Sequence, residues 1–272
     1  MAAKGIGELL VREQLISIDQ LEKAKREQKQ GGGRLGSAFT TAIRGAADVK
    51  RHAGQMVDRR LCCCKNLDGA LNMKLYVTYG SPYARLARII VIEKALEDRV
   101  EIIAAKTRTP GSPYYDINPS GRVPYLVDDS GAGMEDSQII CAYLDGLDGK
   151  PRFHTASRVS DWAYLRLEFA ARGMCDGIAV WGREMVRPEN ERSPTTLAHE
   201  AARAQRMADF FEERVIDPPM QGAPGMAHLI LAIAIEMARK RGMGDLAAGR
   251  PRLTSWMRPI SALPSMRRTA PP

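Results

Sequence analysis

The residue of this sequence best suited to stabilising an anion is a serine at the start of a predicted helix. Ser81 follows a glycine and precedes a proline, and the helix expected from there runs to about residue 96. A hydroxyl in this position can donate a hydrogen bond to an anion such as a thiolate, and the helix dipole favours the same negative charge. Together they would lower the pKa of a bound thiol and supply a nucleophile. The same serine could equally serve only as the N-cap of the helix.

The elements that must position Ser81 follow a β-α-β order and then a β-β-α order. In chain order we expect a strand at 75–79, the helix at 82–96, a strand at 100–103, a loop at 109–121, hairpin strands at 125–127 and 133–135, and a helix at 138–145. This α/β order is thioredoxin-like, here without redox cysteines, and we assign it to a domain over residues 73–150.

Residues 151–272 are predicted to form an all-helical second domain. The helical segments are expected at 159–174 with a continuation to 184, then at 195–214, 226–241 and 253–260. We expect a substrate pocket between these helices and the first domain.

Several motifs in this order and spacing resemble a known family. They are M-K-L-Y-V-T-Y-G-S-P-Y-A-R, N-P-S-G-R-V-P-Y-L and E-D-S-Q-I-I-C-A-Y-L-D, followed by A-R-G-M-C-D-G, R-E-M-V-R-P-E and G-R-P-R-L-T-S-W-M near the end. Residues 73–272 resemble bacterial glutathione S-transferases over their whole length. The resemblance implies glutathione as co-substrate and the two-domain architecture of that family.

By this resemblance, Ser81 or a neighbouring hydroxyl bonds the sulfur of glutathione. Tyr79 and Tyr83 are the alternative donors, whereas Tyr76 is expected in the strand core. Gly80 stands where the family often has threonine, which removes one alternative hydroxyl. A free glutathione thiol has a pKa of roughly 8.5 to 9, so a shift of one or two units would make it a useful nucleophile.

The resemblance also assigns Val123 and Pro124. In the family this proline is cis, and the turn presents the backbone N–H and C=O of the preceding residue to the cysteinyl part of glutathione. Pro124 therefore matters more to the expected site than the side chain of Val123. An ordinary trans turn is the alternative.

The γ-glutamyl end of glutathione carries an ammonium and a carboxylate, and Asp136 and Ser137 match the family's acid–serine pair for it. An acid beside a hydroxyl at a helix start suits both groups, although a simple N-cap has the same composition. Arg122 and Lys106 are candidates for the glycine carboxylate, or else solvated surface charges.

Two further sets of residues belong to the helical part. Trp181, Arg183 and Glu184 are candidates for the wall of the acceptor pocket, although a tryptophan at helical spacing is also typical of a core. Gly225 and His228 stand where the family normally has a Ser/Thr-x-x-Asp capping box. We expect the box to be lost, at a cost of about 1 kcal/mol, and His228 to be structural.

The first 72 residues differ in character from the rest. The stretch G-I-G-E-L-L-V-R-E-Q-L-I-S-I-D-Q-L-E-K-A-K-R-E-Q and the following G-G-R-L-G resemble the N-terminal domain of type IV pilus and type II secretion assembly ATPases, over about residues 4–40. In that family paired motifs bind cyclic di-GMP, but here the second motif is incomplete, so we do not expect the site to close. We interpret residues 1–40 as a partly helical fragment and 41–72 as a poorly ordered linker.

Charge, cysteine content and the length of apolar runs indicate which kinds of partner the protein has. The net charge is +8, but residues 73–272 hold 27 Lys or Arg against 24 Asp or Glu. Basic residues are not interleaved with aromatic ones, so we expect no nucleic-acid partner. Cys62, Cys63 and Cys64 are consecutive, and no cysteine or histidine cluster has zinc spacing, which fits a reduced cytoplasm and predicts no metal. Apolar runs are far shorter than the roughly 18 to 20 residues of a membrane span, so we expect no membrane partner.

The sequence therefore predicts a glutathione S-transferase that attacks a small apolar electrophile, and the resemblance implies a homodimer. One alternative is a glutathione-binding protein of the same fold without catalysis, acting in stress or interaction. Another is a regulatory fusion whose N-terminal fragment docks to pilus or secretion machinery.

Overall fold

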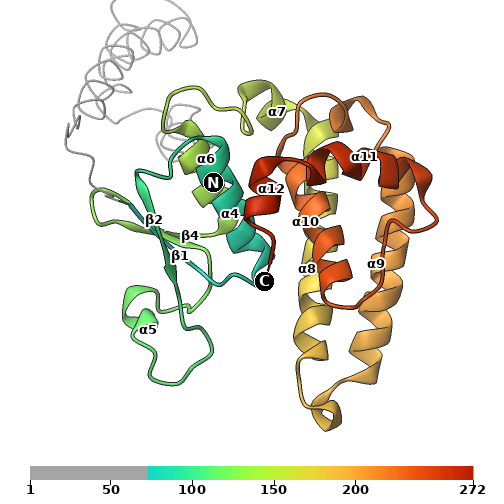
Figure 1. Ribbon diagram of the computed structural model, residues 1–272, viewed down its shortest axis with the longest axis horizontal. Helices are drawn as coiled ribbons and strands as arrows, with labels where there is room; N and C mark the ends of the chain where they lie inside the picture. Colours follow the sequence, from blue (N-terminus) through green and yellow to red (C-terminus); the bar gives the residue numbers. More distant parts are fainter. Residues whose placement is uncertain (1–72, 272) are drawn as a thin grey trace, which may run out of the picture. The chain divides into compact units, whose positions relative to one another are not determined.

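The computed structural model describes residues 73–271, which belong to one compact unit (Figure 1). The strands are β1 (Met73–Val77), β2 (Val100–Ala104), β3 (Tyr125–Val127) and β4 (Gly133–Glu135). The α-helices are α4 (Pro82–Glu93), α5 (Tyr114–Ile117), α6 (Ser137–Gly146), α7 (Ala156–Ser160), α8 (Trp162–Met185), α9 (Pro194–Arg214), α10 (Met226–Lys240), α11 (Pro251–Ser261) and α12 (Pro264–Arg268). Short 3₁₀ turns lie at Glu189–Glu191 and Pro218–Met220. The predicted fragment at 1–40 and linker at 41–72 lie outside the described residues.

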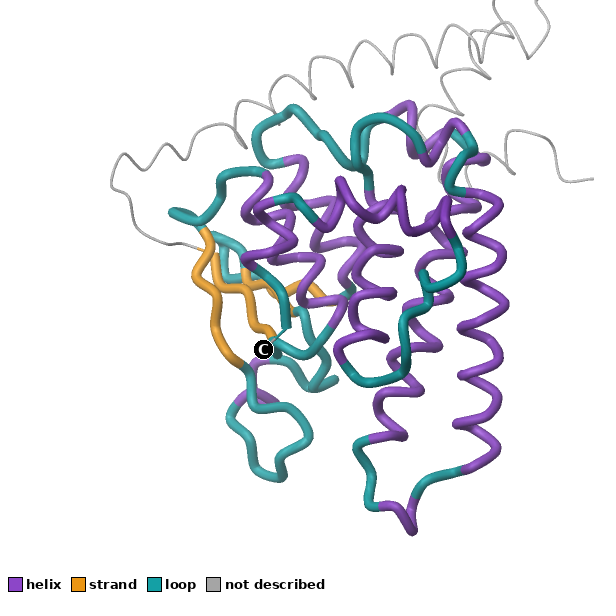
Figure 2. Tube along the Cα trace, turned by 45° about the vertical axis from the view of Figure 1, so that its right-hand side comes forward, coloured by secondary structure: helices purple, strands orange, loops and turns teal. Residues whose placement is uncertain are grey.

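The four strands form one mixed sheet in the order β2-β1-β3-β4. β1 and β2 are parallel, with Met73 opposite Val100, whereas β3 is antiparallel to both of its neighbours. Helix α4 connects β1 to β2, and α6 follows β4, so the β-α-β and β-β-α order predicted from the sequence is confirmed. The strands gather on one side of the described chain, and long helices form the other (Figure 2).

Helix α4 begins and ends for local reasons. Ser81 is its N-cap, and Pro82 at the first helical position has the backbone angle a helix needs. The helix ends at Glu93, earlier than predicted, because Ala95 has φ of 50°, which no helix continues. Most of its length is buried, and it packs against α6 on one side and α10 on the other.

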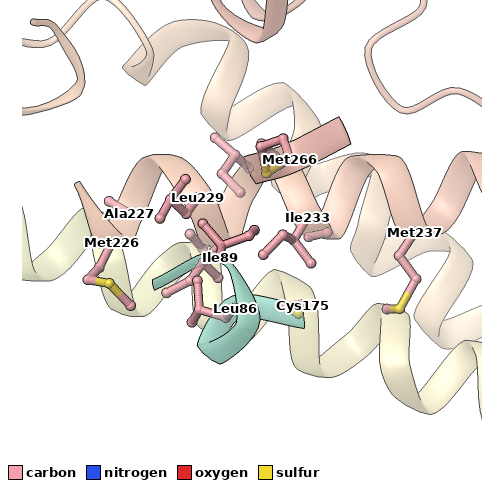
Figure 3. Packing of buried hydrophobic residues seen from close by; sticks show 14 of the residues in the cluster. Leu86, Ile89, Cys175, Met226, Ala227, Leu229, Ile233, Met237 and Met266 are labelled. Carbon is pink, nitrogen blue, oxygen red and sulfur yellow. The ribbon is translucent and has the colours of Figure 1, made fainter. Parts of the chain in front are cut away.

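The core joins the sheet and the helices. Helix α10 is buried almost around its whole circumference, between α8 and α4. In Figure 3 Leu86 and Ile89 of α4 lie near Leu229 and Ile233 of α10, and Cys175 of α8 belongs to the same cluster. One buried cluster thus includes side chains from both sides of the predicted boundary at residue 150, and the two domain limits stay predictions.

The start of α10 corrects the expectation that its capping box is lost. His228 Nδ1 accepts a hydrogen bond from the Gly225 N–H at 3.2 Å, which is the half of the box that an acid normally makes. The hydroxyl of Tyr164, on α8, accepts from the Ala227 N–H at 3.1 Å. It replaces the oxygen that a serine or threonine cap would provide. A Cβ on Gly225 would lie 2.6 Å from that hydroxyl and would overlap the Arg158 guanidinium, so both side chains would have to shift to admit a larger residue.

The long helix predicted from residue 159 is interrupted at Asp161, and a short helix, α7, precedes the break. Asp161 separates α7 from α8 and caps α8, accepting from the Ala163 N–H at 2.8 Å and the Tyr164 N–H at 3.2 Å. A carboxylate that satisfies two free N–H groups is a strong helix start, and it fixes the beginning of the helix that carries Tyr164. Among the described residues, no helix is long and apolar enough to cross a membrane.

Candidate functional site

Ser81 caps α4 and still keeps a proton to donate. Its Oγ accepts a hydrogen bond from the Ala84 N–H at 3.2 Å, and its backbone N–H donates to the Thr78 carbonyl at 3.1 Å. A hydroxyl has one proton besides its acceptor lone pairs, and within residues 73–271 no acceptor takes the proton of Ser81. The two interpretations of this serine are therefore compatible, since capping uses the oxygen and an anion would use the hydrogen.

The tyrosines near Ser81 differ in what their hydroxyls do. Tyr83 donates a short hydrogen bond to Asp176 Oδ1 on α8, and burial together with nearby Cys175 raises the pKa of this phenol. Its proton is thus already used. Tyr79 is 45% exposed, and its ring lies under the guanidinium of Arg88 at 4.7 Å.

The peptide between Val123 and Pro124 is cis, as expected from the resemblance. Pro124 is buried and β3 begins directly after it. In the described part of the chain, neither the N–H nor the C=O of Val123 has a hydrogen-bond partner. An extended chain could therefore pair with this backbone as an added strand would.

A buried polar network fixes the loop before that peptide, and sequence reasoning missed it. Asn118 Nδ2 donates to the Arg122 carbonyl at 3.0 Å and to Glu135 at 3.1 Å, and the Tyr114 hydroxyl also donates to the Arg122 carbonyl. The Ser120 hydroxyl donates to the same Glu135 carboxylate. The asparagine of the N-P-S-G motif was the available signal, because a buried asparagine needs partners.

Asp136 and Ser137 begin α6 with one free group each. Asp136 Oδ1 accepts from the Gln138 N–H at 2.7 Å, so its other carboxylate oxygen is left for a ligand. Its φ of 80° lies in a region that residues other than glycine rarely adopt, and such strain is concentrated at binding sites. The hydroxyl of Ser137, a buried residue, has no partner within the region the structure describes. A carboxylate, a hydroxyl and free helix N–H groups can together hold an ammonium and a carboxylate.

Strand register brings these residues to one edge of the sheet, the edge at which β1, β2 and β4 end and β3 begins. Tyr76 of β1 lies opposite Tyr125 of β3, so the chain leaving β1 toward Ser81 passes the start of β3. Tyr125 also lies opposite Glu135, the last residue of β4, which places Asp136 at the same edge. The strand pairing by itself therefore brings the motifs at Ser81, Val123–Pro124 and Asp136–Ser137 to the same edge.

The two candidate cations are exposed. Lys106 follows β2, whose last residue Ala104 lies opposite Val77, and so it too leaves the sheet at this edge. Arg122 precedes Val123, and its backbone carries the loop hydrogen bonds while its side chain has no ion-pair partner among residues 73–271. Either side chain is free to meet a carboxylate.

A pocket of about 200 Å³ opens beside Ser81. Its walls come from the β1–α4 loop, the start of α4, the second half of α10 and the chain end. The lining residues are Tyr79, Gly80, Ser81, Pro82, Arg85, Ile233, Met237, Lys240, Arg241 and Pro271.

The residues expected in the pocket wall on α8 do not line it. Trp181 is partly buried against the core, as its helical spacing allowed. Glu184 accepts from the Ser193 N–H at 2.8 Å and thereby fixes the connection from α8 to α9. Lys240 and Arg241, which do line the pocket, lie at the end of α10 and directly after it, about 160 positions after Ser81, where no local motif marked them.

Comparison with known proteins gives one family match and several similar proteins. Residues 75–152 match the N-terminal domain of glutathione S-transferases. The chain is 26% identical over 202 residues to YibF of Escherichia coli, an uncharacterised GST-like protein, covering 74% of this chain and 99% of YibF. A glutathione transferase family member from Pseudomonas fluorescens, crystallised with bound glutathione, is 25% identical with a TM-score of 0.64, covering 74% of this chain and 99% of that structure.

A separate short match concerns a secretion protein. The chain is 61% identical over 34 residues to the type IV pilus assembly ATPase PilB of Myxococcus xanthus, which is 12% of this chain and 6% of PilB. The match is too short to show more than a shared fragment. The other matches agree with the observed sheet and helices: the fold is that of glutathione S-transferases, and the chain is similar to members of that family.

Proposed function

We propose that this protein is a glutathione transferase that binds glutathione along the sheet edge and conjugates its sulfur to a small electrophile. The supporting observation is the convergence of three free polar groups at that edge. They are the Ser81 hydroxyl proton, the unpaired backbone of Val123 and the acid–hydroxyl pair of Asp136 and Ser137. A thiolate donor, an unpaired backbone and an acid–hydroxyl pair are the groups that an extended tripeptide with a thiol and charged ends would need.

Each end of glutathione has a proposed partner. The γ-glutamyl ammonium pairs with the free oxygen of Asp136, and its carboxylate takes the Ser137 hydroxyl and the N-terminus of α6. The cysteinyl backbone pairs with Val123 beside Pro124. Arg122 and Lys106 are the proposed partners of the glycine carboxylate.

The chemistry follows from the position of the sulfur near Ser81. Binding the thiolate there stabilises the anion through the serine proton and the dipole of α4, and the thiol proton passes to solvent. The sulfur then attacks an electrophilic carbon, a sulfur–carbon bond forms, and the leaving group departs with the electron pair of the bond that breaks. No step requires a metal.

Ser81→Ala and Ser193→Ala form a matched pair for testing this function. Ser193 caps α9 with the same geometry, accepting from the Thr196 N–H at 3.2 Å, so each substitution removes one cap and costs about 1 kcal/mol of stability. We expect Ser81→Ala to reduce turnover by two orders of magnitude or so, with glutathione affinity little changed. Ser193→Ala should leave both quantities as they are.

The same assay separates transferase from a non-catalytic glutathione binder. A binder would retain glutathione in isothermal titration calorimetry and show no turnover with any of several electrophiles in the wild-type protein. Absence of glutathione binding by the full chain would exclude both functions.

A homodimer is proposed from exposed apolar side chains. Ile139 on α6 and Trp162 and Phe169 on α8 are 60%, 73% and 50% exposed, and the last two lie seven positions apart on one helix face. A second copy would bury such side chains. Sedimentation equilibrium should give a dimer for the wild type and a monomer for Trp162→Glu/Phe169→Glu.

Docking of residues 1–72 to pilus or secretion machinery is a separate proposal, supported only by the 34-residue likeness to PilB. Retention on a cyclic di-GMP matrix, or on a purified pilus ATPase, should then differ between the full chain and residues 73–272. Equal retention of both would contradict it.

A further inference from the structure

The pocket beside Ser81 is positively charged. Three of its lining residues are Arg85, Lys240 and Arg241, and none is acidic. Lys240 and Arg241 have no acidic partner in the described residues. Two uncompensated cations around a small cavity favour an anion over a neutral ligand.

Arg85 adds a third cation that is only partly satisfied. This side chain is 2% exposed, pairs with Glu236 at 2.6 Å through Nη2, and donates from the same nitrogen to the Met266 carbonyl at 2.9 Å. Its Nη1 is buried and lacks a hydrogen-bond partner among residues 73–271. A buried guanidinium nitrogen without a partner is costly, and Arg85 adds positive charge behind the pocket wall.

Arg241 is held in place rather than free in solvent. Its Nη2 donates to the Gly80 carbonyl at 3.1 Å, next to Ser81. Its Nη1 lies 2.5 Å from where a Cβ on Gly182 would be, so the guanidinium packs closely against α8 at this glycine. A positioned guanidinium binds a carboxylate at a lower entropic cost than a mobile one.

Apart from the hydroxyls of Ser81 and Tyr79, the side chains in the rest of the pocket lining are apolar. Ile233 and Met237 lie one turn apart on α10 (Figure 3), and Pro82 and Pro271 complete the lining with the exposed ring of Tyr79. The volume of about 200 Å³ lies below that of pockets for drug-sized ligands, so the occupant is small.

We propose that this pocket selects acceptor substrates that carry a carboxylate on a small apolar body. The carboxylate meets Lys240 and Arg241, the apolar body contacts Ile233 and Met237, and the reacting carbon faces the Ser81 side. The acceptor role rests on the proposed transferase function, whereas binding of the carboxylate does not. Acidity of the substrate is thus added to the expectation of a small apolar electrophile.

Binding is measured first without glutathione. Calorimetry compares para-toluate with para-toluamide, its neutral counterpart of the same shape. We expect the carboxylate to bind roughly tenfold or more tightly, as a charge-assisted contact provides. Lys240→Gln should remove most of that preference, and Lys74→Gln, which removes an exposed lysine of β1, should preserve it. Equal affinities in the wild type, or no effect of Lys240→Gln, overturn the proposal.

Turnover is measured with a reactive pair, para-(chloromethyl)benzoate and para-(chloromethyl)benzamide. The sulfur–carbon bond forms as chloride leaves with the carbon–chlorine electron pair, and the thiol proton goes to solvent. We expect Lys240→Gln to lower kcat/KM for the benzoate about tenfold and to leave the benzamide value unchanged. Equal losses for both substrates overturn the specificity role.

A competition experiment distinguishes failure of this inference from failure of the proposed function. Saturating S-methylglutathione should leave para-toluate binding intact, because the two ligands occupy neighbouring sites. If S-methylglutathione abolishes toluate binding, a carboxylate of glutathione occupies the pocket, and the acceptor assignment is wrong although glutathione binding stands. If glutathione fails to bind while toluate binds, the transferase function and the acceptor role fail together, and the carboxylate site alone remains.

Discussion

The histidine at the start of α10 makes the stability of this protein depend on pH. His228 is 2% exposed, and its Nδ1 accepts from the Gly225 N–H while its ring stacks on Trp256 with centroids 5.6 Å apart. Burial lowers the pKa of His228 from 6.5 to about 4, and Arg158 acts in the same direction. Accepting the Gly225 hydrogen requires a neutral imidazole nitrogen, so a proton on Nδ1 would break the cap.

The sign and size follow from the difference between the folded and unfolded pKa. The stabilisation is complete above pH 6.5 and is lost as the pH falls toward about 4, because the unfolded chain then binds a proton that the folded chain excludes. A shift from 6.5 to about 4 corresponds to about 3 kcal/mol. Carboxylates also titrate in this range, so a difference between variants is needed.

His228→Asn supplies that difference, since its side-chain oxygen can accept the same N–H and does not titrate. Urea unfolding followed by tryptophan fluorescence should show the wild type losing about 3 kcal/mol more than His228→Asn between pH 6.5 and pH 4. His199→Asn, at an exposed position of α9, is the control. If the free energy of unfolding falls equally with pH in the wild type and in His228→Asn, the reasoning is refuted.

Three further predictions concern single contacts. Asp136→Asn should weaken glutathione binding roughly tenfold in calorimetry, because the proposed ammonium partner loses its charge while the cap on Gln138 can persist; an unchanged affinity would contradict the role. Tyr83→Phe should cost about 1 kcal/mol in urea unfolding yet keep full turnover, because its proton is already given to Asp176; lost turnover would make Tyr83 the sulfur donor. Gly225→Ala should destabilise by about 1 to 2 kcal/mol through displacement of Tyr164 from the cap, whereas Gly146→Ala in α6, with nothing near its Cβ position, should be neutral or stabilising.

The parts of the fold that local chemistry determines could be predicted from the sequence. Ser81 followed by proline marked the start of α4, and turn residues marked the hairpin of β3 and β4. The first strand was predicted two residues late, because Thr78 and Tyr79 have strand composition. In the structure the Ser81 N–H bonds the Thr78 carbonyl and turns the chain there.

Elements that depend on distant contacts could not be predicted. The four-residue helix α5 lies in a loop read as irregular, where Tyr114 and Asn118 bond the Arg122 carbonyl. Helix α12 is equally short and packs on α4. Short helices have little stability of their own, so their sequences carry almost no signal.

In the candidate site, too, some residues could be predicted from local motifs and others could not. Ser81, the Val123–Pro124 pair and the Asp136–Ser137 pair each belong to a local motif, and strand register then brings them to one edge. The charge of the neighbouring pocket depends on Lys240 and Arg241, which reach the β1–α4 loop only through the packing of α10 against α4. A tertiary arrangement of this kind leaves no pattern in either segment.

The ionisation of glutathione on the protein is the most direct test of the site at Ser81. Ultraviolet difference spectra of the wild type with saturating glutathione, titrated with pH, should show thiolate absorbance appearing one to two units below the roughly 8.5 of a free thiol. In Ser81→Ala the absorbance should return to the range of free glutathione, while Ser193→Ala follows the wild type. A bound thiol that titrates like free glutathione in the wild-type protein would contradict the account.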